Sequence, residues 1–208
     1  MQDSAINRKS YNLVAANYAQ EHGESLAWKP ELEKFIGYLP LPEVVIDLGC
    51  GHGDETVYLA EHVPTAKVIG VDFAEQMIHL AIAKKSSAEF VTADIARYKP
   101  ELKVQGIWAR ASLHHLNDRQ LQMLFKTIGS YGDASLVIAM INKVGEGEEI
   151  EEKQKYGTRL VRYFNYFSPH KVETIAKDYG YSILEQYVKE EGGHQFLVTY
   201  LKRRILAT

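Results

Sequence analysis

The chain has 208 residues, of which 46% are hydrophobic and 25% are charged, as is typical of one globular domain with a substantial core. The formal net charge of −3 excludes the overall positive field that favours nucleic acid or anionic membranes, and neither partner is expected. Cys50 is the single cysteine, so an internal disulfide is excluded. The polar start and the lack of an apolar run of about 20 residues lead us to expect a cytoplasmic protein.

Short apolar runs alternate with amphipathic stretches along most of the chain. The short runs are rich in β-branched residues and end at glycines, whereas the longer stretches carry apolar residues at helical spacing. The predicted order is strand 44–48, helix 54–62, strand 67–72, helix 75–85, strand 89–93, strand 106–109, helix 118–128, strand 135–141, helix 169–179, strand 181–188 and strand 195–201.

This order predicts an α/β fold. Strands that alternate with helices form parallel βαβ units with right-handed crossovers, and the helices cover both faces of the sheet. The last two predicted strands flank a turn at residues 191–193 and predict an antiparallel hairpin. We therefore expect a doubly wound, mostly parallel seven-stranded sheet with an antiparallel C-terminal hairpin strand.

We expect one domain over residues 1–208, with four parts. An N-terminal helical cover spans 1–39, and a cofactor-binding core spans 40–141. A cover insertion follows at 142–167, and a C-terminal helix and hairpin occupy 168–208. The two cover segments are charged and rich in tyrosine, and they fit no βαβ unit.

A glycine-rich turn follows the first predicted strand. Gly49 and Gly51 have no β-carbons, so the backbone can approach a ligand closely, while Gly53 permits tight packing of strand on helix. Asp72 ends the next predicted strand, where its carboxylate can accept hydrogen bonds from both hydroxyls of a ribose. This arrangement predicts a cofactor with an adenosine half. The alternative is an ordinary tight turn between strand and helix.

Two acidic residues bear on which cofactor this is. In a nicotinamide site the third glycine comes one residue later, where Asp54 stands in this chain. Asp47, just before the turn, would oppose a diphosphate and attract an ammonium group. A ligand with adenosine at one end and an amino acid at the other satisfies both constraints, which favours S-adenosylmethionine.

Four segments, in order, resemble the motifs of class I S-adenosylmethionine-dependent methyltransferases. They are residues 45–53, 71–77, 90–95 and 106–116, and the resemblance covers roughly residues 40 to 140. Residues 162–168 and 178–181 also resemble small-molecule members of the family. Gln105 stands where the family usually has an aspartate, a departure that bears on the subfamily rather than on the cofactor.

The resemblance and the turn together imply a set of cofactor contacts. Three of these residues also have a structural interpretation. Asp94 would cap a helix before Ala96, Met77 would fill the core, and Phe73 would fill the sheet edge. The expected contacts are Asp47, Gly49, Cys50, Gly51, Gly53, Asp72, Phe73, Met77, Asp94, Ile95 and Arg110.

Candidates for chemistry follow the fourth strand and lie on the N-terminal helix. His115 is expected to face the pocket as an acid–base group, with His114 as a structural hydrogen-bonder. Tyr11 and Tyr18 are seven residues apart, hence on one helix face, and either border the methyl group or only pack the helix onto the body. Arg162, Tyr163 and Tyr166 either border an acceptor or occupy solvated loop positions, and the loop is the preferred interpretation. No metal site is expected.

The leading hypothesis is methyl transfer to a small-molecule acceptor. The alternatives are an RNA or protein methyltransferase, or a cofactor-binding module without turnover. The identity of the acceptor and the oligomeric state, monomer or homodimer, are left open by the sequence.

Overall fold

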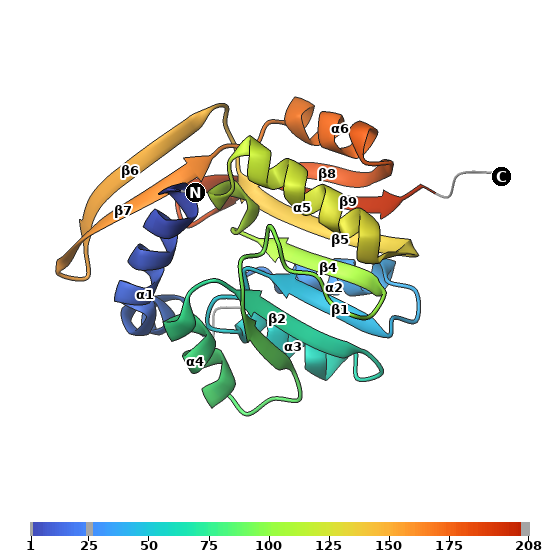
Figure 1. Cartoon of the computed structure of the whole chain (residues 1–208), viewed down its shortest axis with the longest axis horizontal. Coiled ribbons are helices and arrows are strands. Elements are labelled where there is room, and N and C mark those ends of the chain that lie inside the picture. The colour runs from blue at the N-terminus through green and yellow to red at the C-terminus, as the bar shows by residue number, and fades with distance from the viewer. Residues whose placement is uncertain (1, 24–26, 205–208) are drawn as a thin grey trace.

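The computed structural model describes residues 2–23 and 27–204, and its centre is a seven-stranded sheet (Figure 1). Met1 and residues 24–26, which belong to the predicted N-terminal cover, lie outside the described residues, as do residues 205–208. The strand order is β3-β2-β1-β4-β5-β9-β8. β1 to β5 run parallel, and β9 runs antiparallel to both β5 and β8. The predicted fold class is confirmed.

The strands match the predicted ones closely. Their bounds are β1 Val44–Leu48, β2 Lys67–Asp72, β3 Glu89–Thr92, β4 Val104–Arg110, β5 Gly132–Lys143, β8 Tyr181–Glu191 and β9 His194–Arg203. All five residues of β1 are buried, because the sheet is covered on both faces.

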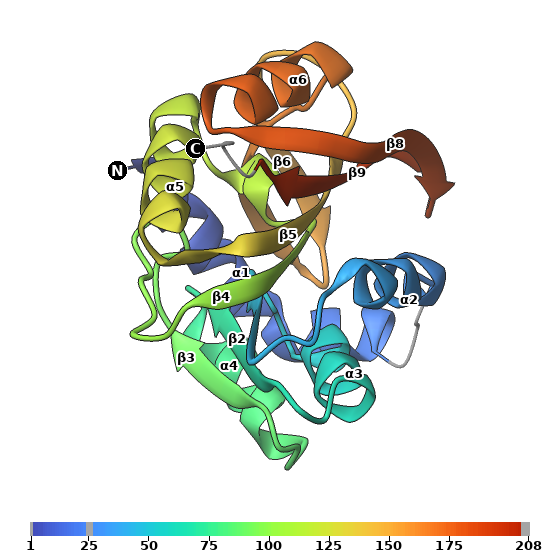
Figure 2. The ribbon, with the colours of Figure 1, turned by 90° about the vertical axis from the view of Figure 1, so that its right-hand side faces the viewer.

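Helices cover the two faces of the sheet (Figure 2). On one face, α2 (Lys29–Tyr38) and α3 (Asp54–His62) pack through Phe35 and Leu59 with Val45 and Trp108. On the other face, α5 (Asp118–Tyr131) and α6 (Pro169–Asp178) pack through Leu124 and Ile175 with alternate strand residues such as Ile46. A reciprocal pair of hydrogen bonds between Asn117 and Gln120 fixes the start of α5.

The N-terminal helix α1 (Gln2–His22) lies beside a two-stranded sheet of β6 (Glu148–Lys155) and β7 (Thr158–Asn165), away from the main sheet (Figure 1). Asn7 holds the two together, because its side-chain amide donates to the carbonyl of Tyr163 at 3.0 Å and accepts from the amide of Tyr163 at 2.8 Å. The helix α4 (Glu75–Ala83) packs against the other side of α1.

The preferred prediction of solvated loop positions is wrong for Arg162 and Tyr163, which lie in β7. The side chain of Tyr163 is buried. β6 is dominated by glutamate and lysine and shows no apolar alternation, so the pattern that marks a strand is absent. Tyr166 follows β7, and its hydroxyl donates to Glu149 at 2.6 Å.

The chain order of the strands reverses between β1 and β4. β2 and β3 follow β1 on one side, and β4 and β5 continue on the other, so the carboxyl ends of β1 and β4 border a crevice that neighbouring connections leave open. Among the described helices, none is both long and apolar enough to cross a bilayer.

Candidate functional site

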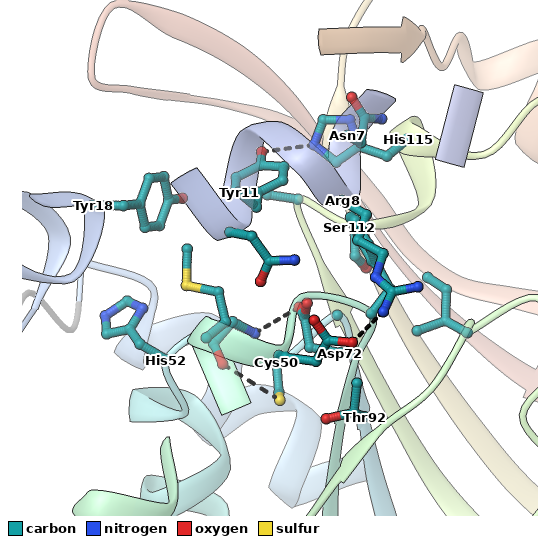
Figure 3. A pocket seen from close by; sticks show the side chains of 18 of the residues that line it. Asn7, Arg8, Tyr11, Tyr18, Cys50, His52, Asp72, Thr92, Ser112 and His115 are labelled. Carbon is teal, nitrogen blue, oxygen red and sulfur yellow. Dashed lines mark hydrogen bonds and ion pairs between the residues drawn. The ribbon is translucent and has the colours of Figure 1, made fainter. Parts of the chain in front are cut away.

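A cavity of about 720 Å³ lies at the carboxyl ends of β1, β2 and β4, beneath α1 (Figure 3). Most of the residues predicted from the sequence line it. They are Tyr11, Tyr18, Gly49, Cys50, Gly51, Asp72, Phe73, Met77, Asp94, Ile95, Arg110 and His115. Asp47 and Gly53 do not line it.

The turn after β1 presents its backbone to this cavity. Gly49 has φ +81°, and a β-carbon there would collide with the side chain of Ser112. Gly51 has φ +54°, and a β-carbon there would meet no atom of the protein within 4 Å. Both residues therefore need glycine for the left-handed backbone, and Gly51 also leaves open space for a ligand.

Gly53 and Asp47 lie behind the turn. Gly53 has φ +86° and starts α3, and a β-carbon there would come within 2.8 Å of Ala81, so this glycine permits close packing. The Asp47 carboxylate accepts a hydrogen bond from the Thr56 hydroxyl at 2.6 Å. Burial raises the pKa of Asp47 to about 8, and the nearby charge of Glu55 adds to the shift.

Asp72 is the best-defined polar group of the cavity wall. Figure 3 shows its carboxylate at the cavity. Its two oxygens accept hydrogen bonds from backbone amides, one from Gly51 at 3.0 Å and one from Ala74 at 2.8 Å. Burial raises the pKa of Asp72 to about 6, and these amides oppose part of that shift. Because each carboxylate oxygen has two lone pairs, each can accept one more hydrogen bond.

Apolar and polar groups meet beyond Asp72. Met77 lines the cavity and also fills a small core cluster with Ala15, so both predicted roles are compatible. One carboxylate oxygen of Asp94 accepts from the Ala96 amide at 3.0 Å, the predicted capping contact, although no helix follows. Phe73 packs edge-on against Tyr11, with ring centroids 6.2 Å apart.

His115 and Tyr11 form a hydrogen-bonded pair at the other end of the cavity (Figure 3). Nδ1 of His115 lies 2.8 Å from the Tyr163 carbonyl, which can only accept, so Nδ1 carries the proton. Nε2 therefore accepts from the Tyr11 hydroxyl, at 2.8 Å. Burial lowers the pKa of His115 to about 4, which keeps the ring neutral.

His114 has a structural contact. Its Nδ1 accepts from the backbone amide of Lys143 at 3.2 Å, and the backbone amide of His114 donates to the Asn142 side chain at 3.1 Å. The ring therefore ties η1 (Leu113–His115), the short 3₁₀ helix after β4, to the end of β5.

Several groups that position the site carry no recognisable pattern in the sequence. Glu55 accepts from Trp108 Nε1 at 2.8 Å and forms an ion pair with Arg110, which fixes that guanidinium at the cavity wall. Arg8 forms an ion pair with Glu75 and ties α1 to α4. Since these partners lie 55 and 67 residues apart in the chain, no local pattern relates them.

A family model described as a methyltransferase domain matches residues 45–131, which include the turn, Asp72 and η1. Residues 45–131, less than half of the chain, are therefore similar to a methyltransferase domain. The structure is similar to that of magnesium protoporphyrin IX methyltransferase from Synechocystis with bound S-adenosylmethionine, with a TM-score of 0.75 and 18% identity over 98% of both chains. It is also similar to 1,6-didemethyltoxoflavin-N1-methyltransferase from Burkholderia thailandensis, with a TM-score of 0.74 and 17% identity over 96% of this chain and 88% of the other.

One curated relative is trans-aconitate 2-methyltransferase from Variovorax paradoxus, 38% identical over 91 residues. The match covers 42% of this chain and only 35% of that relative. The similarity to the family model ends at residue 131, before β5 and the β6–β7 hairpin begin.

Proposed function

We propose that this chain is an S-adenosylmethionine-dependent methyltransferase that acts on a small-molecule acceptor. The observation that carries the proposal is the pairing of Asp72 with the open backbone at Gly51 on one cavity wall. The free lone pairs of Asp72 suit a ribose diol, and the missing β-carbon of Gly51 leaves space beside them.

The other cavity residues complete the proposed donor site. Met77, Asp94 and Ile95 would border the adenine, and Arg110 lies on the side where the amino-acid end would be. Asp47 lies behind the turn, where a ligand ammonium group would favour its ionised form and lower its raised pKa. The contacts of these residues with the donor are part of the proposal.

S-adenosylmethionine supplies a methyl carbon on a sulfonium. A lone pair of the acceptor forms the new bond to this carbon, while the electron pair of the broken carbon–sulfur bond stays on sulfur. The protein has to align the reacting atoms and exclude water, and alignment alone supplies roughly 7 to 11 kcal/mol. α1 closes the cavity through Tyr11 and Tyr18, whose rings are 5.8 Å apart.

Tyr11 and His115 are proposed to orient the acceptor and take part in moving its proton. The acceptor would donate to the Tyr11 oxygen, whose own hydrogen is directed at Nε2 of His115. Burial lowers the pKa of His115 to about 4, so the ring is a weak base at neutral pH. Positioning, rather than strong general-base catalysis, should therefore account for most of the rate.

A small-molecule acceptor is supported by how the site is covered. α1 and the β6–β7 hairpin lie over the open end of the cavity, and α1 is fixed to β7 through Asn7 and Ser10. A polymer would need an open groove instead. The trans-aconitate 2-methyltransferases match only part of this chain, so trans-aconitate is one candidate acceptor among small molecules.

Incubation with S-adenosylmethionine labelled on the methyl group, in a cell extract separated into small-molecule, RNA and protein fractions, tests this function. We expect label in the small-molecule fraction. Label confined to RNA or protein would overturn the proposed acceptor class. Binding of S-adenosylhomocysteine without labelling of any fraction would instead indicate a cofactor-binding module.

A further inference from the structure

A second cavity, of about 370 Å³, adjoins the proposed donor site. It lies between α1, the β6–β7 hairpin, the end of β5 and the turn between β8 and β9. Tyr11, Tyr18, His22, Arg110 and Ala111 line both cavities, so these residues mark where the two meet. Since Tyr11 and Arg110 border the proposed donor site, a molecule in the second cavity can reach that site.

The walls of this cavity combine aromatic surface with positive charge. Trp28, Leu160, Phe164 and Phe196 provide apolar walls. The cationic residues that line it are Arg110, Lys143, Lys153, Lys155 and Arg162, and the carboxylates that line it are Glu21 and Glu191.

Most of these cations are already paired. Arg110 pairs with Glu55, and Lys155 pairs with Glu21. Lys153 and Arg162 share one carboxylate, that of Glu151. The positive charge near Glu151 is therefore only partly neutralised.

Lys143 is the exception. It stands at the end of β5, half-buried, and its ammonium lies 4.3 Å from the centre of the Phe164 ring. Among the side chains that the structure describes, which are those of residues 5–23 and 27–204, no carboxylate forms an ion pair with Lys143. Burial lowers the pKa of Lys143, and the charges of Arg162 and Lys153 lower it further, although Glu151 opposes them.

Arg162 approaches the same ring from 5.2 Å, and its side chain is 15% exposed. Its Nε is buried and has no hydrogen-bond partner among the described residues. A buried donor without a partner is costly unless a ligand or water meets it. Two cations at one aromatic ring, one without a counter-ion and one with a spare donor, thus lie on the wall of one cavity.

We propose that the second cavity is the acceptor site of this enzyme and binds a small organic anion with an aromatic or other apolar body, holding its carboxylate or phosphate through Lys143 and Arg162. This inference rests on the proposed methyltransferase function. Lys143 lines the second cavity but not the first, so the anion it holds anchors the acceptor away from the donor. A different group of the acceptor then reaches Tyr11, and fixing the molecule at a remote point restricts the geometry of attack.

Calorimetry on protein saturated with S-adenosylhomocysteine tests this site. The probes are benzoate, phenylacetate and phenyl phosphate, compared with the neutral benzamide and phenylacetamide. The variants are Lys143→Met, which removes the unpaired cation, and Lys153→Met as the matched control. Lys153 lines the same cavity, but it is paired with Glu151 and its side chain is 38% exposed.

At least one anionic probe should bind the natural protein tenfold or more tightly than its neutral amide, since a hydrogen bond to a charged group is worth about a factor of ten or more. Lys143→Met should remove this preference, and Lys153→Met should change it less than about threefold. No anion preference, or equal loss in both lysine variants, would overturn the proposal. Trans-aconitate is titrated as a further probe. If it binds and none of the aromatic anions does, the proposal that the ligand has an apolar body is refuted.

A titration with S-adenosylhomocysteine alone, before any probe is added, separates this inference from the function on which it rests. If S-adenosylhomocysteine itself fails to bind, the proposed function fails. If it binds with equal affinity to the natural protein and both lysine variants, any failure of the anionic probes concerns the second cavity alone.

Discussion

Replacing Asp72 with alanine should weaken donor binding more than any other single change in the cavity. In the proposed complex the carboxylate accepts hydrogen bonds from two ribose hydroxyls while its other lone pairs stay on the amides of Gly51 and Ala74. A hydrogen bond to a charged group is worth about 1.5–3 kcal/mol net, so two amount to about 3–6 kcal/mol. The dissociation constant for S-adenosylhomocysteine should therefore rise at least about 100-fold.

The assay is calorimetric titration at about pH 8, where Asp72 is ionised because its pKa lies near 6. Asp72→Asn keeps the volume and one acceptor oxygen, so it should lose less affinity than Asp72→Ala. Asp178→Ala, at an exposed position outside the cavity lining, is the matched control and should bind normally. Folding of each variant is checked by circular dichroism. A folded Asp72→Ala protein that binds within about threefold of the natural protein would refute a ribose contact.

Three further changes probe the same site. Gly51→Ala puts a methyl group into the ligand space and should weaken S-adenosylhomocysteine binding, measured by calorimetry, tenfold or more, which is about 1.4 kcal/mol. Gly147→Ala is the control, because Gly147 has φ +77° and equally open space but lies outside this cavity, and it should leave binding unchanged. The pKa of Asp72 is raised to about 6, so affinity for S-adenosylhomocysteine should fall as pH drops through 6, because the carboxylate becomes protonated. In the ligand-free protein the free energy of unfolding should fall as pH rises through 6. An affinity that does not change with pH would show that Asp72 takes no part in binding. Tyr11→Phe leaves Nε2 of His115 without its donor and should lower the free energy of unfolding by about 1–2 kcal/mol in urea titrations, while unchanged stability would contradict the hydrogen bond.

The sequence predicted the sheet well because its strands and helices carry strong local patterns. β1 and β2 are short runs rich in valine and isoleucine; a glycine turn follows β1, and Asp72 ends β2. Their predicted bounds equal those in the structure. α3 was equally clear, since the glycine turn precedes it and His62 ends it before Pro64. The contribution of these elements to the cavity follows from the parallel sheet, which collects their carboxyl ends at one edge.

The cover of the site could not be predicted as well. β6 is a charged strand that acquires its partner only through β7, so no alternation in its sequence revealed it. Asn7 bonds to Tyr163 across 156 residues, and nothing in either segment marks that contact. The side of the site expected to hold the acceptor thus depends on long-range contacts, whereas the donor side depends on local turns.

Asp47 shows a different limit of prediction from sequence, which is the direction of a side chain. The sequence predicts that Asp47, just before the turn, attracts an ammonium group, but the direction of its side chain depends on Thr56 in the following helix. The carboxylate lies behind the backbone rather than on the cavity wall. Its contact with an ammonium group remains a prediction.

A crystal structure with S-adenosylhomocysteine bound would test the proposed donor site most directly. The ribose hydroxyls should lie within hydrogen-bonding distance of the two Asp72 oxygens, with the ligand passing Gly51 and its sulfur directed toward Tyr11. A ligand that sits elsewhere, or a ribose that is turned away from Asp72, would contradict this assignment.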